Sequence, residues 1–475
     1  MVYDIAIIGA GITGAGIAYE LSKYKLNIAL IDKYAMPTQG ASKANSGILH
    51  AGYDDSLDML RGKLVVEGNR LYDKWQKEIG FRMIRNGSLV VAFDEEQLNT
   101  LKELLKKGEK KGIPGLAIWN KEELQKNEPN LNKDAIGALF APTAGVVCPM
   151  EVVNFLFKNA VMNGVAPLLG HDVLDFKKEN GEITTIVTNQ GNISAKTIIN
   201  AAGVNGDIIS SKAGIDKYKI TPRKGEYILL EPHEDYFVER VIFPTPTKVS
   251  KGILVTHTIT GDILLGPTAV NMGDSERENN KTTKEGLEEI ITKFKHLIPT
   301  LSTELTVKTF TGIRAQPNTN DFIIEDYDTP KNFINAIGIR SPGLTSAPAI
   351  AELVIEILKK KIGNLEKKSD YNQIKREQFN VTEIAKKDPT WGKTLTPQLD
   401  SPSLPLLEMS WNFGVQKELY NYTCFTDLGL GIDLSSTFQN ALIQWIKEKK
   451  VKTDEIIYRH PGSVQIFDKS CKEEK

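Results

Sequence analysis

The 475-residue sequence contains only three cysteines, Cys148, Cys424 and Cys471, and they lie far apart. An odd number of separated cysteines predicts neither a disulfide framework nor a cysteine-ligated metal site, and it favours a reducing compartment such as the cytoplasm. Apart from His50, discussed below, the histidines form no HxxxH or HExxH pattern. No metal is therefore expected.

The sequence also lacks a surplus of charge and a long apolar run. Its 59 Lys and Arg residues face 60 Asp and Glu residues, for a net charge of −1, so no broad field favours nucleic acid or an acidic membrane surface. No run reaches the roughly 18 apolar residues of a membrane-spanning helix, and the opening MVYDIAIIGAG is typical of a buried strand rather than a leader. We therefore expect a cytoplasmic protein without a nucleic-acid partner, for which peripheral membrane contact stays open.

What is present is an ordinary globular composition, with 41% hydrophobic residues, enough for two or three domains. Residues 3–33 predict a strand, a glycine turn, a helix and a second strand closed by Asp32. The turn has the GxGxxG spacing of a dinucleotide-binding unit, in which glycines admit a pyrophosphate and the carboxylate accepts from ribose hydroxyls. The expected nucleotide-contacting residues of this unit are Gly9, Gly11, Thr13, Gly14, Asp32 and Lys33.

The stretch ASKANSGILHAGYD, residues 41–54, directly follows this unit. Both NAD and FAD bind to such glycine turns, but a nicotinamide-type fold would be expected to continue into its next βα unit here. Small residues instead suit a loop laid along an extended cofactor, with Ser42 and Asn45 reaching phosphate or ribityl oxygens. The stretch therefore favours FAD, and we expect Ser46 and Gly47 to line the same site.

Within this context the sequence resembles the FAD-dependent oxidoreductases of the D-amino-acid-oxidase superfamily. NSGILHAGYD followed by KLVVEGNRLYDKW is similar to the glycerol-3-phosphate oxidase/dehydrogenase branch, and the resemblance extends to about residue 393. Further segments resemble that branch in order and spacing: 196–207 (KTIINAAGVNGD), 223–231 (RKGEYILLE), 251–269 (KGILVTHTITGDILLGPTA), 311–326 (TGIRAQPNTNDFIIED) and 335–358 (NAIGIRSPGLTSAPAIAELVIEIL).

The resemblance implies an α/β fold with a Rossmann-like FAD-binding domain of the glutathione-reductase type and an inserted α+β substrate domain. We expect the FAD-binding domain to comprise residues 1–80, 145–222 and 308–365, and the substrate domain 81–144 and 223–307. The runs EYILLE, GILVTHT and DILLGPT predict an antiparallel sheet over the flavin, with the catalytic cleft between the domains.

The helix expected to begin near Thr345 would direct its positive N-terminal end toward the flavin, where negative charge gathers on reduction. Further cofactor contacts follow from the resembling segments. They are Val173, Ala202, Gly203, Gly312, Gly343, Leu344 and Thr345.

Four residues are candidates for the chemistry. His50, just after the cofactor loop, suits a general base near neutrality, although a positioning role and a covalent link to the flavin stay open. Arg314 resembles the arginine that clamps the anionic end of the substrate, and a guanidinium binds phosphate or carboxylate bidentately. Lys251 and Ser341 resemble two further phosphate contacts. Because a dianionic phosphate gains from a second cation and a hydroxyl, phosphate is the favoured anion.

Residues 366–475 form a C-terminal extension that departs from longer relatives. Those relatives carry a cysteine-rich iron–sulfur module here, whereas only Cys424 and Cys471 remain, fewer than the four thiolates a cluster needs. Residues 436–452 predict an amphipathic helix with a basic end, for which docking, homodimerisation and membrane contact are open. The electron acceptor would then be dioxygen, a quinone or a soluble carrier.

The sequence thus predicts an FAD-dependent oxidation of sn-glycerol 3-phosphate to dihydroxyacetone phosphate by hydride transfer to flavin N5. The rival reaction is oxidation of a 2-hydroxy or amino dicarboxylic acid such as L-2-hydroxyglutarate, with Arg314 on a carboxylate. A further rival is a non-catalytic protein that retains the flavin-binding fold for recognition.

Overall fold

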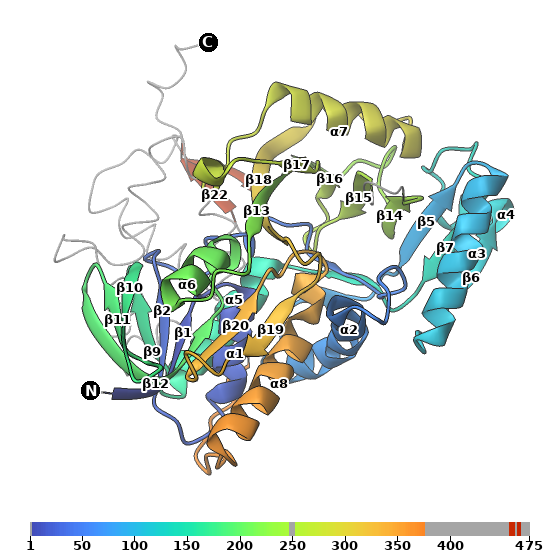
Figure 1. Ribbon diagram of the computed structural model, residues 1–475. Coiled ribbons are helices and arrows are strands. Elements are labelled where there is room, and N and C mark those ends of the chain that lie inside the picture. Colours follow the sequence, from blue (N-terminus) through green and yellow to red (C-terminus); the bar gives the residue numbers. More distant parts are fainter. Residues whose placement is uncertain (1, 247–251, 376–455, 461–462, 467–475) are drawn as a thin grey trace.

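The computed structural model describes residues 2–246, 252–375, 456–460 and 463–466. One layer is an eight-stranded sheet in which β1 lies between β12 and β2 and runs parallel to both (Figure 1). Its central strands are apolar because helices cover the sheet. In spatial order the strands are β10 (Val173–Glu179), β11 (Glu182–Thr188), β12 (Gly191–Asn200), β1 (Val2–Ile8), β2 (Ile28–Asp32) and β9 (Ala166–Leu169), with β20 (Phe333–Ile337) beside β12 and β19 (Ile323–Asp326) beside β20.

Four helices pack together against this sheet: α1 (Ile12–Leu21) contacts α5 (Pro149–Met162) and α8 (Gly343–Ile362), and α8 contacts α2 (Leu60–Ile79). The largest buried cluster lies here and includes Ile5, Tyr19 and Trp75. A shorter helix, α6 (Gly206–Ala213), contacts β10, β12 and β20. The predicted βαβ unit is therefore confirmed, with its helix ending at Leu21.

A nine-stranded sheet forms the second part of the molecule (Figure 1). β13, β15 and β16 pair antiparallel, so the predicted antiparallel sheet is confirmed. Its helices are α3 (Glu95–Lys110), α4 (Lys121–Asn127) and α7 (Lys284–Leu297). The strand order is β17 (Val270–Asn271), β13 (Ile220–Leu230), β16 (Ile263–Gly266), β15 (Leu254–His257), β14 (Val241–Pro244), β5 (Ser88–Ala92), β7 (Gly137–Ala141) and β6 (Ala117–Asn120), with β18 (Thr306–Pro317) on β13.

The chain forms a third, small sheet from segments that lie between the strands of the two larger sheets in the sequence. It consists of β3 (Ile48–Leu49), β8 (Gly145–Val147) and β4 (Met83–Ile84), with β8 in the middle. Short 3₁₀ turns cover Gly203–Asn205 and Asp274–Glu276, and β21 (Ile456–His460) pairs with β22 (Ser463–Ile466).

One expected domain boundary differs from the strand pairing. Residues 308–317 were expected in the cofactor domain, but β18 pairs with β13 from Ile220 to Leu230 and so lies in the second sheet. Residues 220–222 belong to the same ladder. The difference arises because a long antiparallel pair satisfies its backbone groups along its whole length, regardless of where a sequence motif begins.

Lys251 and the predicted helix 436–452 lie outside the described residues, as does a Pro- and Ser-rich stretch at about 395–405 that the sequence predicts to be a linker. Within the described ranges, no helix has both the length and the apolar character needed to cross a membrane.

Candidate active site

The turn between β1 and α1 forms one end of a cavity. Gly9 has φ +109°, and a Cβ there would lie 2.3 Å from the carbonyl oxygen of Ala201. A Cβ on Gly14 would lie 1.8 Å from the Gly9 carbonyl oxygen. Gly11 precedes α1 and lines the cavity. The first and third glycines therefore allow the tight turn, whereas the second leaves the cavity open at the helix N-terminus.

Asp32 lies at the end of β2, beside this turn. Its Oδ2 accepts from the Ala10 amide (2.7 Å) and its Oδ1 from the Tyr34 amide (2.9 Å). Burial raises the pKa of the Asp32 carboxyl, against these two hydrogen bonds. Lys33 is ion-paired with Glu278, and both residues line the cavity. Asp32 thus holds the turn together, and a ribose hydroxyl would share its carboxylate with backbone amides.

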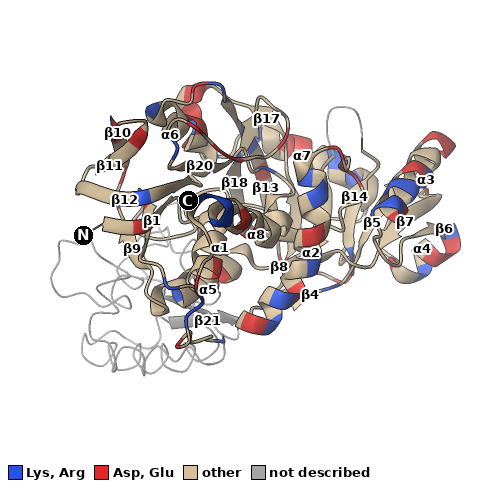
Figure 2. Cartoon of the chain, turned by 60° about the horizontal axis from the view of Figure 1, so that its bottom comes forward, with Lys and Arg blue, Asp and Glu red and all other residues tan. Residues whose placement is uncertain are grey.

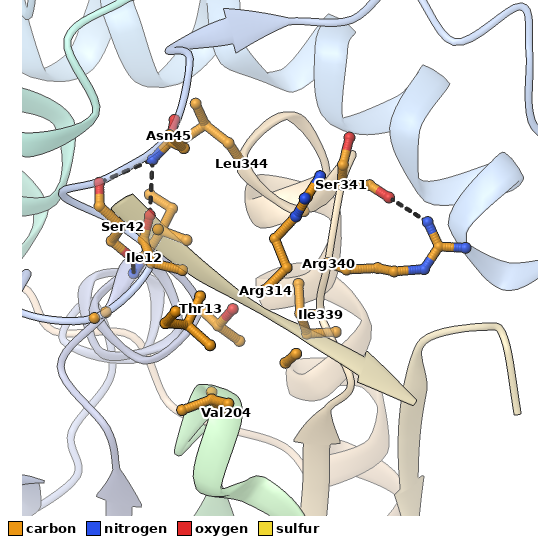
Figure 3. Close-up of a pocket in the computed structure, with 18 of the residues that line it drawn as sticks. Ile12, Thr13, Ser42, Asn45, Val204, Arg314, Ile339, Arg340, Ser341 and Leu344 are labelled. Carbon is orange, nitrogen blue, oxygen red and sulfur yellow. Dashed lines mark hydrogen bonds between the residues drawn. The ribbon is translucent and has the colours of Figure 1, made fainter. Parts of the chain in front are cut away.

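The loop before β3 is organised by its own polar side chains (Figure 3). Ser42 Oγ accepts from the Ile12 amide (2.9 Å). Asn45 Nδ2 donates to the carbonyls of Ala41 and Ser42 (3.0 Å each), and its Oδ1 accepts from the Gly47 amide (2.9 Å). Asn45 lines the cavity but uses its amide to shape the loop, so its contact with a cofactor oxygen stays a prediction; the Ser42 hydroxyl retains a hydrogen to donate.

His50 lines the cavity and is held by its backbone. Its amide donates to Thr345 Oγ1 (3.0 Å), and its carbonyl accepts from Asn69 Nδ2 (2.9 Å). Its ring lies 5.8 Å from that of Phe243. Thr345 is buried and its hydroxyl also donates to the Ile48 carbonyl (3.3 Å). Thr345, whose contact with the cofactor stays a prediction, fixes the segment that carries His50.

Arg314 projects from β18 toward Ser341 in the loop before α8 (Figure 3). Its Nη2 donates to the carbonyl oxygens of Lys224 (2.9 Å) and Thr268. Among the described residues, its Nη1 has no hydrogen-bond partner. Burial lowers the pKa of Arg314 from its ordinary value, and nearby Arg223 adds to this. The Arg314 Nε donates to the Arg223 carbonyl (3.4 Å). The guanidinium is therefore anchored at two nitrogens and offers the third, Nη1, to a ligand.

All these parts meet in one cavity of about 770 Å³, within the usual range of small-molecule sites. Gly14, Gly47 and Thr345 are expected site residues that do not line it. The expected residues that do line it are Gly9, Gly11, Thr13, Asp32, Lys33, Ser42, Asn45, Ser46, His50, Val173, Ala202, Gly203, Gly312, Arg314, Ser341, Gly343 and Leu344.

The cavity lining also includes residues that the sequence did not single out, and three of them are polar residues on or beside the strand pair β13–β18 and the loop before α8. Tyr227 is buried, and its ring stacks on Phe310 at 4.7 Å. Arg223 and Arg340 also face the cavity. All three lie inside segments used for the resemblance: Arg223 and Tyr227 in RKGEY, and Arg340 in RSPGL. Their place in these segments, and the charge of the two arginines, could have identified them from the sequence.

The residues of this cavity fit a dinucleotide cofactor. Glycine backbone at a helix N-terminus, a carboxylate at the end of β2 and a long run of small loop residues form one continuous lining, as an extended, twice-phosphorylated molecule requires. At the other end the cavity reaches the N-terminus of α8, where Gly343 begins the helix. Within the described ranges, no group of three or more potential metal ligands occurs.

Residues 4–357 match the DAO family, described as FAD dependent oxidoreductase. The glycerol 3-phosphate dehydrogenase of Caloramator mitchellensis is 40% identical, over 83% of this chain and 83% of that protein. The mitochondrial L-2-hydroxyglutarate dehydrogenase of Nematostella vectensis is 25% identical, over 74% and 90%. The structure of dithionite-reduced L-α-glycerophosphate oxidase from Mycoplasma pneumoniae, with FAD bound, is similar with a TM-score of 0.75 and 30% identity, over 79% of this chain and 98% of that chain. The family match includes every residue that lines the cavity.

Proposed function

Because the chain belongs to the DAO family of FAD-dependent oxidoreductases, as its motifs predicted, we propose that it oxidises sn-glycerol 3-phosphate to dihydroxyacetone phosphate. The observation that carries this proposal is the single cavity that joins the glycine turn to His50, Arg314 and Ser341. When bound, FAD supplies at N5 an acceptor for the hydride from the substrate carbon. The glycerol 3-phosphate dehydrogenase and glycerophosphate oxidase relatives support the choice of substrate.

We assign removal of the hydroxyl proton to His50. The imidazole accepts a proton near neutrality, since its unperturbed pKa is about 6.5. Bonds from Thr345 and Asn69 fix the backbone on both sides of its side chain, which places the ring without using its nitrogens. The His50 side chain lines the cavity, and we assign it to the substrate hydroxyl there.

We assign the phosphate to Arg314 and Ser341. The guanidinium is held at Nη2 by two carbonyls, so its orientation is set before the substrate arrives, which reduces the entropy lost on binding. A charge-assisted bond to phosphate is stronger than one between neutral groups. Lys251 remains part of the proposal on the strength of the sequence alone.

The rival substrate class is a 2-hydroxy dicarboxylic acid, which the L-2-hydroxyglutarate dehydrogenase relative supports at lower identity. Anaerobic mixing of the purified flavoprotein with each substrate separates the two. We expect glycerol 3-phosphate to bleach the visible flavin band, and L-2-hydroxyglutarate, glycerol and glycine to leave it unchanged. Bleaching by hydroxyglutarate alone would overturn the phosphate assignment and leave Arg314 as a carboxylate clamp.

The electron acceptor is the finer part of the proposal. Relatives are named both as a dehydrogenase and as an oxidase, so dioxygen, a quinone and a soluble carrier are the candidates. Admitting air, a short-chain quinone or a soluble dye to the bleached protein, and following the return of the flavin band, ranks them by rate. The acceptor with the fastest return is the one to assign.

Loss of the Arg314 guanidinium should weaken substrate binding in the transition state. Alanine at this position is expected to lower kcat/KM for glycerol 3-phosphate by on the order of 10² or more, because a charge-assisted contact to the substrate anion is lost. Flavin reduction at low substrate concentration measures the effect.

The matched control is Arg70→Ala, because Arg70 is an exposed arginine paired with Glu67 on α2. Flavin content and thermal midpoint of both variants are compared, since alanine at 314 also removes a donor from three carbonyls. Reduction of Arg314→Ala at the wild-type rate would place the clamp elsewhere.

A further inference from the structure

The arginines of this chain differ in whether a carboxylate neutralises them. Of the nine arginine side chains that the structure describes, six are ion-paired. Elsewhere on the molecule, positively and negatively charged side chains occur together on the helices α2, α3 and α7 (Figure 2). The other three arginines, Arg223, Arg314 and Arg340, have no carboxylate partner in the described part of the chain, and all three line the cavity. The six ion pairs are Arg61–Asp55, Arg70–Glu67, Arg82–Glu151, Arg85–Asp73, Arg240–Glu128 and Arg277–Asp207.

Arg223 and Arg314 are direct cross-strand neighbours. They are Cα partners in the antiparallel pair of β13 and β18, so both side chains lie on one face of the sheet, and both line the cavity. Like charges directly opposite each other destabilise a sheet. The Nε of Arg223 is moreover buried without a hydrogen-bond partner in the described structure. An anion bound between the two guanidiniums would offset their mutual repulsion and would give the Arg223 Nε a hydrogen-bond acceptor.

Arg340 adds a third cation from the loop before α8. Its Nη2 donates to Asn320 Oδ1 (2.9 Å) and its Nη1 to the Ser341 carbonyl (3.3 Å), which are neutral oxygens (Figure 3). Its Nε is buried without a described partner. Burial lowers the pKa of Arg340 to about 10, and repulsion from Arg61 and, less, from Arg223 and Arg314 adds to this shift, whereas attraction to Asp55 opposes it. A half-buried cation without an ion-pair partner is costly, and such groups gather at functional sites.

Two carboxylates that line the cavity, Asp54 and Asp55, offset the charge of this cluster only in part. Asp55 lines the cavity but is held by Arg61, with 2.7 Å between Arg61 Nε and Asp55 Oδ1. Asp54 is the other carboxylate beside His50 in the sequence. Four guanidiniums thus share the substrate end of the cavity with two carboxylates.

We propose that Arg223 and Arg340 complete, together with Arg314, a site for a doubly charged anion, and that this surplus of positive charge makes the enzyme select phosphorylated over carboxylated alcohols. The inference rests on the proposed function in taking the substrate to be a small anionic alcohol. A single carboxylate neutralises one guanidinium and leaves two others half-buried and repelling each other. A phosphate dianion offers two charges and three acceptor oxygens to the same three cations.

The test compares two anions of similar shape and different charge. Sulfate carries two charges and methanesulfonate one, and both are fully ionised near neutrality, so no titration of the ligand intervenes. Each is titrated into the flavin-loaded protein at constant ionic strength, with the change in flavin absorbance as readout and competition with glycerol 3-phosphate as a second measurement. We expect the wild type to bind sulfate at least about 10-fold more tightly than methanesulfonate.

Glutamine at position 223 or 340 removes one charge and keeps a polar side chain. Each substitution is expected to weaken sulfate binding by about 10- to 100-fold, as hydrogen bonds to charged groups are worth, and methanesulfonate binding by less than about 3-fold. Arg223→Lys and Arg340→Lys retain the charge and should keep most of the preference for sulfate. The matched control, Arg70→Gln, should leave both affinities unchanged, since Arg70 is exposed and far from the cavity lining.

Two results would overturn the inference: an unchanged preference for sulfate in both glutamine variants, or an equal loss for the two anions. Sulfate binds without being turned over, so the measured sulfate affinities do not depend on whether the proposed reaction is correct. A wild type that glycerol 3-phosphate does not bleach, with variants that lose the sulfate preference, would refute the proposed reaction and support the anion site. If glycerol 3-phosphate bleaches the wild type but the variants keep the sulfate preference, the proposed reaction is supported and the anion site is refuted.

Discussion

Valine at position 11 is expected to give folded protein that carries no flavin. Gly11 has φ −77° and ψ −173°, an extended conformation that any residue adopts, so the substitution does not strain the backbone. A Cβ there would lie 3.0 Å from Ser42 Oγ, and the methyl groups beyond it would occupy the cavity at the N-terminus of α1. The pyrophosphate of FAD then cannot approach the helix amides.

Flavin released by heat per mole of chain measures this effect, and we expect it to fall below about a tenth of the wild-type value because the binding turn is blocked. Gly273→Val is the matched control: Gly273 is also extended, does not line the cavity, and a Cβ there would meet its nearest atom at 3.7 Å. Gly9 is unsuitable, since its φ of +109° strains any substitution. Undiminished flavin in folded Gly11→Val would refute the assignment of this turn to the cofactor.

Asparagine at position 50 is expected to slow anaerobic flavin reduction by glycerol 3-phosphate by roughly 10²–10⁴, the usual worth of a positioned proton acceptor. Asparagine retains a polar side chain but cannot accept the hydroxyl proton near neutrality. The backbone bonds from Thr345 and Asn69 do not involve the ring, so the segment should keep its place. The reduction rate of the wild type should fall as the pH drops below the imidazole pKa, and this fall should disappear in the variant.

Thr345→Val separates proton removal from positioning. It removes the hydroxyl oxygen that accepts from the His50 amide but leaves the imidazole, so we expect a loss of under about 10-fold, in line with the net value of one neutral hydrogen bond. A His50→Asn variant that reduces its flavin within about 10-fold of the wild-type rate would exclude the base role. Acid precipitation tests the third role, since flavin that stays with the wild-type pellet and leaves with the variant supernatant would establish a covalent link.

The sequence pattern predicted which residues lie at the cavity, but it did not predict their hydrogen-bond partners. Ser42 and Asn45 were expected because small polar residues suit a loop along a cofactor. Both lie at the cavity, yet the amide of Asn45 is used within the loop itself. Composition indicates that a polar loop is present, but which partner each polar atom takes depends on the backbone geometry around it.

The sequence alone determined the βαβ unit, its glycine turn, Asp32 and the family, because these depend on periodicity and spacing within about thirty residues or on ordered motifs. Only the tertiary structure decided which cations share the substrate end. Arg223 and Arg314 are 91 positions apart and meet through the register of β13 and β18, and Thr345 reaches His50 across 295 positions. Such contacts arise from strand register and helix packing over long separations, which local patterns of hydrophobicity do not encode.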